Sequence, residues 1–163
     1  MSKQSEATPS IDLAFDWVKD VLDTQISLVD SLDNKAMTLF GVATAILGIG
    51  ASLGQNILNP KAILPFACGA IAFIAYIFVI GFTISALAVR GFDTLKNPII
   101  MREYYWDLSP VQFKIQLLAH LEDAYTSNKE KVDKKGLAVR NLVPAMAFEV
   151  VFLVLSLWLG FLA

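Results

Sequence analysis

Three long apolar stretches divide the chain, and each could cross the roughly 30 Å hydrocarbon core of a membrane as a helix of about 20 residues. They cover residues 36–54, 62–89 and 141–163. Residues 1–35 and 90–140 are rich in charges, and their apolar positions recur at steps of three and four, which is typical of amphipathic helices. The pattern predicts an all-α integral membrane protein with three transmembrane helices, extended by cytoplasmic helices that form a small bundle.

The amino-terminal segment predicts a helix that continues into the first span. Its apolar seam includes Gln25 as one polar position and otherwise consists of Ile11, Ala14, Val18, Val21, Leu28 and Leu32, and the stripe is widened by Trp17, Leu22 and Val29. We expect one nearly continuous helix over residues 10–54. Its water-exposed half could pack on the middle segment of the same chain, or form a coiled coil between subunits.

The middle segment predicts a second soluble helix that leads into a span. Ser109 suits the N-cap and Pro110 the first helical position. Asn128 and Lys135 interrupt its apolar seam, which is formed by Leu118, Leu121, Tyr125, Val132 and Val139. We expect this helix to run into the third span at residue 141.

Composition supports the membrane class and excludes several others. The chain is 56% hydrophobic and 17% charged, with a mean hydropathy of +0.59. A net charge of −2 argues against nucleic-acid binding, which favours a basic face. Cys68 is the single cysteine, which excludes a disulfide framework. Because no phosphate loop, metal-ligand set or nucleophile motif appears, we expect neither an enzyme nor a bound cofactor.

The distribution of Lys and Arg predicts the orientation in the membrane. Residues 90–140 contain nine Lys or Arg, and the amino-terminal tail contains Lys3, Lys19 and Lys35, whereas the connection between the first two spans has only Lys61. Basic segments are retained in the cytoplasm. The prediction is therefore a multi-pass inner-membrane protein with a cytoplasmic N-terminus, residues 1–35 and 90–140 in the cytoplasm, a hairpin of spans over residues 36–89, and a periplasmic C-terminus after the span of residues 141–163.

The first span contains many small residues, which make only weak contacts with hydrocarbon. Lipid gives helices no hydrophobic reason to associate, so close packing in membranes relies on small side chains. This face could pack on the other two spans of its own chain. Alternatively, it could meet the same helix of neighbouring subunits around a pore axis; the candidate positions for a pore or packing face are Gly41, Thr44, Gly48, Ser52 and Gln55.

Glu149 is the single charged residue within the third span. An ionised side chain in hydrocarbon costs at least a few kcal/mol and usually faces protein or water. Three interpretations remain open: a buried pair with Lys35 or Arg90, a protonated carboxylic acid, or a ring of carboxylates in an oligomer that favours cations.

At "LDNKAMTLFG" the chain resembles the Pycsar transmembrane effectors and the related SLATT class of small bacterial membrane proteins. The matching positions are Asp33, Lys35 and Ala36, at the boundary where an amphipathic helix becomes the first span. The order of spans and soluble helices is also similar, over most of the chain.

The resemblance implies an inner-membrane effector of antiphage defence that a cyclic mononucleotide activates and that then impairs the membrane. The chain departs from the fuller pattern because it has no recognisable nucleotide-binding domain. Any such ligand would have to be bound by cytoplasmic helices, where several cations are available: Lys35, Arg90, Arg102, Lys114 and Arg140.

The expected function is therefore an oligomeric membrane effector or a channel-like protein in contact with the lipid bilayer. Two other functions stay open: a non-conducting scaffold that recruits a cytoplasmic partner through the amphipathic tail, and an accessory subunit of a transporter.

Overall fold

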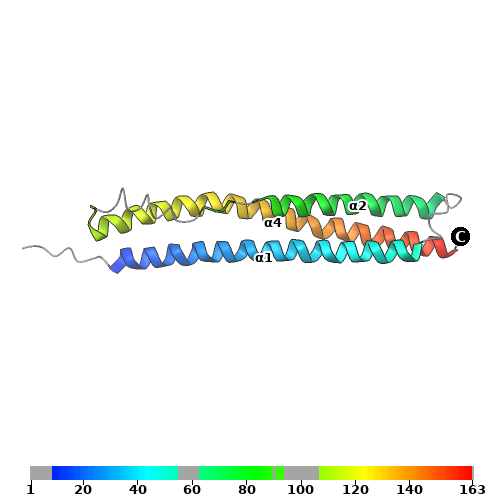
Figure 1. Cartoon of the computed structure of the whole chain (residues 1–163), viewed down its shortest axis with the longest axis horizontal. Coiled ribbons are helices and arrows are strands. Elements are labelled where there is room, and N and C mark those ends of the chain that lie inside the picture. The colour runs from blue at the N-terminus through cyan, green and yellow to red at the C-terminus, as the bar shows by residue number, and fades with distance from the viewer. Residues whose placement is uncertain (1–8, 55–62, 90, 94–106, 163) are drawn as a thin grey trace, which may run out of the picture. The chain divides into compact units, whose positions relative to one another are not determined.

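The computed structural model describes residues 9–54, 63–89, 91–93 and 107–162. These residues form three helices, α1 (Pro9–Leu53), α2 (Ile63–Ala88) and α4 (Pro110–Leu162), and include no strand (Figure 1). All three helices are long and apolar enough to cross a membrane. The prediction of an all-α chain with three such helices is confirmed.

Helices α1 and α4 are both much longer than a membrane is thick. At 1.5 Å per residue, the 45 residues of α1 extend about 68 Å and the 53 residues of α4 about 80 Å. The prediction that each amphipathic segment continues as one helix into an apolar stretch is confirmed. Pro144 lies inside α4 without ending the helix.

The start of α4 is fixed by a capping box, as its sequence predicts. The Ser109 hydroxyl accepts a hydrogen bond from the backbone N–H of Gln112 (3.4 Å), and the Gln112 side-chain oxygen accepts one from the backbone N–H of Ser109 (3.3 Å). These bonds satisfy donors that have no partner inside the helix. Pro110, which lacks an N–H, occupies the first helical position.

The chain folds into two compact units, each considered by itself. The described parts of residues 30–90 and 134–163 form the three-helix unit, and the described parts of residues 1–29 and 91–133 form the two-helix unit, named after its described helices. Helices α1 and α4 contribute to both units.

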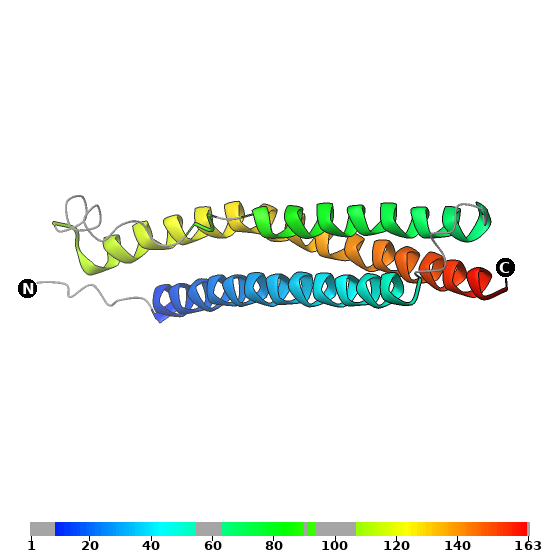
Figure 2. The same ribbon diagram turned by 45° about the vertical axis from the view of Figure 1, so that its right-hand side comes forward.

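The three-helix unit packs α2 against the carboxyl-terminal halves of α1 and α4 (Figures 1 and 2). Its core repeats every seven residues in each helix: Ala36, Ala43 and Gly50 on α1, Pro65, Ala72, Val79 and Ala86 on α2, and Lys135, Leu142, Glu149 and Ser156 on α4. A seven-residue repeat keeps one face of each helix toward its neighbours when the helices supercoil. Small residues at these positions allow the backbones to approach closely.

The polarity of this unit is that of a membrane-spanning bundle. Glu149 and Ser156 lie inside, whereas large apolar side chains lie outside, including Phe73 (56% exposed), Phe78 (58%) and Trp158 (60%). Such an apolar surface suits lipid and would be an exceptionally large exposed patch in water. The protein is therefore a multi-pass membrane protein.

The two-helix unit packs α1 on α4 through Val18, Leu22, Leu121 and Ala124. The two helices run parallel. The ion pair of Asp12 with Lys114 lies near the start of both helices, and the bond of Gln25 to the Tyr125 carbonyl lies further along both. In the isolated chain the amphipathic half of α1 thus packs on the middle segment.

The packed face of α1 includes two of the residues that widen the predicted seam, whereas Trp17, the third, is 66% exposed. Leu22 and Val29 are buried, whereas Leu28, which the seam included, is 45% exposed. The reason is that Leu22 and Val29 continue the seven-residue repeat of Ala36, Ala43 and Gly50. The small residues of the span therefore determine which of two apolar stripes packs.

We predict that Gly50→Leu lowers the thermal stability of the protein in detergent. A Cβ atom at Gly50 would lie 2.6 to 2.9 Å from side-chain atoms of Leu153, and overpacking of this kind costs about 1–3 kcal/mol. Gly81→Leu is the matched control, since Gly81 is exposed on α2 with open space around it. Equal melting temperatures for the two variants would contradict the close contact of α1 with α4.

Candidate functional site

The boundary motif that carries the family resemblance joins α1 to α4. The Asp33 carboxylate lies 2.7 Å from the ammonium group of Lys135, whose side chain is only 1% exposed. Ala36 is fully buried, in a cluster with Ala138, Val139 and Leu142. Lys35 is exposed. Asp33 and Ala36 thus have a packing role, and the cation that Asp33 meets is Lys135.

The small residues of the first span occupy two opposite faces of α1. One face is the packed set described above. The other face contains the residues two positions before each member of the packed set. At about 100° per residue, it lies about 200° around the helix from the packed face. We call it the outer seam, and its members, all exposed and spaced four and three residues apart, are Asn34, Thr38, Gly41, Ala45, Gly48 and Ser52.

The outer seam has no partner within the described chain. A Cβ atom added at Gly41 or Gly48 would meet nothing within 4 Å. The Ser52 hydroxyl donates to the Ile49 carbonyl of its own helix (2.8 Å). Gly41, Gly48 and Ser52, three of the candidate positions, thus share one unoccupied face.

The two other candidates of this set do not join the outer seam. Thr44 is exposed but lies toward α2, where its hydroxyl is 2.9 Å from the Tyr76 hydroxyl. Since Thr44 also donates to the Phe40 carbonyl (2.8 Å), Tyr76 is the donor between the two hydroxyls. Gln55 lies outside the described residues.

Glu149 is completely buried inside the three-helix unit. Neither of its carboxyl oxygens has a hydrogen-bond partner among the described residues. It is also the single Asp, Glu, Lys, Arg or His in residues 36–54, 63–89 and 141–162. The carboxyl group therefore meets no counter-ion in the described parts of the spans.

The expected pair of Glu149 with Lys35 is not formed. Glu149 follows Lys135 by 14 residues, about 21 Å along α4, whereas Lys35 is exposed near the boundary motif. Arg90, the other expected partner, lies outside the described residues. The carboxyl group also faces its own bundle, whereas a carboxylate ring between subunits would need it on an outer face.

A further polar cluster, which the sequence analysis did not identify, holds residues 91–93 against α4. The buried Asn128 amide accepts a bond from the Asp93 N–H (2.7 Å) and donates to the Asp93 carbonyl (2.8 Å). Gly91 adopts a φ of 76°, a conformation that glycine adopts without strain. This arrangement fixes the segment that follows α2.

The Asp93 carboxylate completes this cluster. It accepts bonds from the Ser127 hydroxyl (2.6 Å) and the Lys131 ammonium (3.2 Å), and Lys131 also donates to the Gly91 carbonyl (2.6 Å). The hydrogen bond from Ser127 and then the bond and charge of Lys131 hold the pKa of Asp93 below its ordinary value.

One signal in the sequence could have identified the buried polar residues of α4. Asn128, Lys135, Glu149 and Ser156 all fall on one seven-residue repeat with Leu121 and Leu142. The interruptions of an apolar seam are therefore buried contacts: Asn128 holds Asp93, Lys135 pairs with Asp33, and Ser156 donates to the Pro65 carbonyl (2.7 Å).

The described residues of neither unit bring together the cations that could bind an anionic ligand. Lys35 and Arg140 are exposed in the three-helix unit, and Lys114 pairs with Asp12 in the two-helix unit. Arg90 and Arg102 lie outside the described residues. Comparisons with protein-family models, curated proteins and solved structures give no match.

We predict an asymmetric response to removing either partner of the boundary ion pair. Asp33→Asn should destabilise the protein by about 3 kcal/mol, because it removes the carboxylate from an ammonium group that is buried. Lys135→Met should cost less, since the Asp33 side chain is 37% exposed and removing Lys135 leaves a less buried charge than removing Asp33 does. The double variant should regain part of the loss in a double-mutant cycle of unfolding in detergent. Strictly additive effects would rule out the pair.

We predict that Glu149→Gln retains the thermal stability of the native chain, whereas Glu149→Lys loses it. Gln has nearly the same shape without a charge, and a permanent charge inside a span costs on the order of 3 kcal/mol. Glu122→Gln, at an exposed position of the same helix, is the control. If Glu149→Gln unfolds as readily as Glu149→Lys, the protein requires an ionised carboxylate. Unchanged assembly and ion flux in Glu149→Gln would eliminate the carboxylate ring.

Proposed function

We propose that the protein is a homo-oligomeric, channel-like membrane effector in which the outer seams of several α1 helices face a common axis. The observation that carries this proposal is the contrast between the outer seam and the rest of the outer surface of the spans. The span of α1 exposes large side chains, such as Ile49 and Leu53, on the flanks of its outer seam, as α2 does with Phe78 and α4 with Trp158. The outer seam itself presents only small or short polar residues along its whole length, including Gly41, Ala45 and Gly48.

The physical chemistry of the membrane favours a partner for this seam. Against lipid, a stripe of glycine and alanine makes few dispersion contacts, whereas against another helix it permits close approach of the backbones. A second copy of α1 supplies an equally small surface. The hydroxyls of Thr38 and Ser52 and the amide of Asn34 would give a narrow axis polar positions at intervals.

The remaining parts of the proposal rest on the family resemblance at Asp33, Lys35 and Ala36. They are a bacterial inner membrane, a role in antiphage defence, activation by a cyclic mononucleotide, and impairment of the membrane as the outcome. The charge distribution supports a cytoplasmic location for the two-helix unit. The ligand would then reach that unit from the cytoplasm.

A non-conducting scaffold is the second candidate, and one observation favours it. Leu13 and Trp17 are 73% and 66% exposed on the part of α1 that belongs to the two-helix unit. Exposed apolar side chains of this size are typical of surfaces that bind another protein. Leu13 and Trp17 precede Gly41 and Ala45 of the outer seam by 28 residues, which is four repeats of seven, so they continue the face of that seam. A second copy of α1 that packs on the outer seam is therefore one such partner.

The first experiment is to measure the mass of the purified protein in detergent and its ion flux in liposomes, with and without cyclic mononucleotides. A closed ring that conducts, and does so more strongly with nucleotide, supports the effector. A sealed oligomer or a monomer under every condition supports the scaffold.

We predict that Gly41→Leu and Gly48→Leu each dissociate the oligomer and abolish its ion flux, because a bulky side chain separates the α1 backbones. The helix content should not change, since both positions have open space within the chain. Ala147→Leu places the same side chain at an exposed position of α4 and should leave the mass unchanged. An unaltered mass and flux in both glycine variants would place the subunit interface elsewhere.

A further inference from the structure

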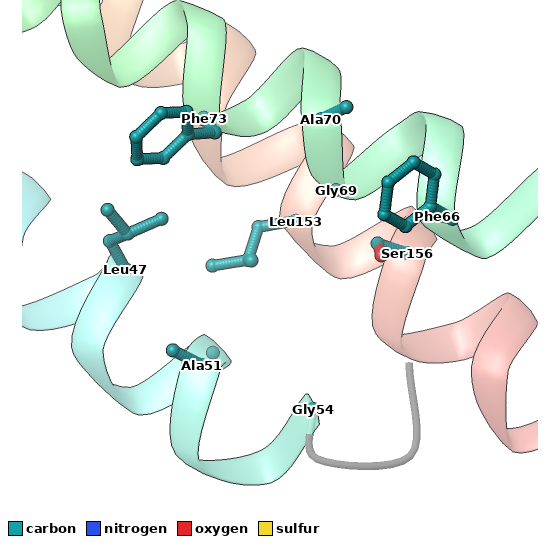
Figure 3. Close-up of a pocket in the computed structure, with 10 residues that line it drawn as sticks. Leu47, Ala51, Gly54, Phe66, Gly69, Ala70, Phe73, Leu153 and Ser156 are labelled. Atoms are coloured by element: carbon teal, nitrogen blue, oxygen red, sulfur yellow. The ribbon is translucent and has the colours of Figure 1, made fainter. Parts of the chain in front are cut away.

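A cleft of about 330 Å³ lies where α1 ends beside α2 and α4, within the three-helix unit. Figure 3 shows Leu47 and Ala51 of α1, Phe66 and Phe73 of α2, and Leu153 of α4 around this space. Ala51, Phe66, Ala70 and Phe73 are exposed, so the cleft opens on the outer surface of the bundle between α1 and α2. Its size falls at the lower end of the range of ligand pockets, about 300–1,000 Å³.

Glycine and alanine on two helices create the cleft. Gly50 and Ala51 line it from α1 and Gly54 from the position directly after α1, while Gly69 and Ala70 line it from α2. The deep wall is made by Leu153, which packs against Gly50, and by Ser156, whose hydroxyl lies 3.2 Å from the position of a Cβ atom at Gly69. The hollow therefore follows from the small residues and is bounded by well-packed neighbours.

The lining specifies an apolar occupant. Among the described residues that line the cleft, none has a charged side chain, and Ser156 alone has a side chain with a polar group. That hydroxyl already donates to the Pro65 carbonyl (2.7 Å). An occupant with a polar group would meet no free donor or acceptor among these side chains, whereas a hydrocarbon chain loses nothing by entering.

The position of the cleft selects the source of that hydrocarbon. Apart from Gly54, which follows α1 directly, the lining residues belong to helices that are long and apolar enough to span a membrane, so the mouth opens into lipid. An α-helix of a partner is about 10 Å across, too wide for a space of this volume. The cleft also lies beside the packed face of α1, away from the outer seam, so it would stay open in the proposed oligomer.

We infer that this cleft is a binding site for one acyl chain of a membrane lipid, inserted between α1 and α2 and ending against Leu153. The chain fills a space that helix packing leaves empty, and it contacts all three spans at once. The site depends on the spans being in a membrane and does not depend on oligomerisation or on conduction.

The test uses the full chain in vesicles of phosphatidylethanolamine and phosphatidylglycerol that contain a phospholipid with a diazirine on one acyl chain. After photolysis, peptide mapping by mass spectrometry locates the adducts. We expect adducts concentrated on Leu47, Phe73 and Leu153, above the level at exposed lipid-facing positions such as Val151 and Trp158.

Two kinds of substitution should change this labelling in opposite directions. Ala51→Phe and Ala70→Phe fill the mouth at exposed positions and should abolish the concentrated adducts, while Leu153→Ala deepens the cleft and should increase them. Ala147→Phe adds the same bulk at an exposed position outside the cleft and should change nothing. Helix content and elution volume confirm that each variant is folded.

Two outcomes would overturn the inference. One is an even distribution of adducts over the lipid-facing surface that the filling variants do not alter. The other is a disulfide between two copies of an Ala51→Cys variant in a Cys68→Ser background, since it would show that a second subunit covers the mouth.

Discussion

The close approach of α1 to its neighbours through Ala36, Ala43 and Gly50 is the constraint on which the three-helix unit depends. In lipid, burying apolar side chains brings little gain, so the helices are held by dispersion contacts and by a few polar bonds. Contacts of this kind require short distances between backbones. A glycine beside Leu153 and alanines in the central cluster provide them, and these residues determine the face of α1 that packs.

The same constraint explains where the polar residues of α4 lie. Positions seven residues apart face the other helices, so any polar residue at these positions becomes buried and needs a partner. Lys135 and Ser156 find partners in Asp33 and the Pro65 carbonyl. Glu149 has none among the described residues, which makes it the one position of this repeat that packing does not explain. An intramembrane acid of this kind is expected to have a function.

Helix type and extent could be predicted from the sequence because each rests on local signals: apolar length for the spans, and Ser109 with Pro110 for the start of α4. The pairing of Asp33 with Lys135 could not, since it depends on the register between helices whose partners are 102 residues apart. The stripe predicted on α1 contained the packed residues Val18, Leu22 and Val29, but also Trp17 and Leu28, which are exposed. Local periodicity could not separate these residues because all of them are apolar and fall at helical spacing.

Small residues have two different consequences on α1, one for packing within the chain and one for its outer face. The second bears on whether α1 only anchors the chain or also assembles with another helix. Where they face α2 and α4, they bring the backbones together at Ala36 and Ala43 and leave a hollow at Ala51, where the helices end. Where they face outward, at Gly41 and Gly48, nothing in the described chain uses them. A helix that served only to anchor the chain would need large side chains on that outer face, as α2 has with Phe73 and Phe78. The outer seam is thus unfavourable for anchoring in lipid and favourable for close packing against another helix, which is the physical basis of the assembly that we propose.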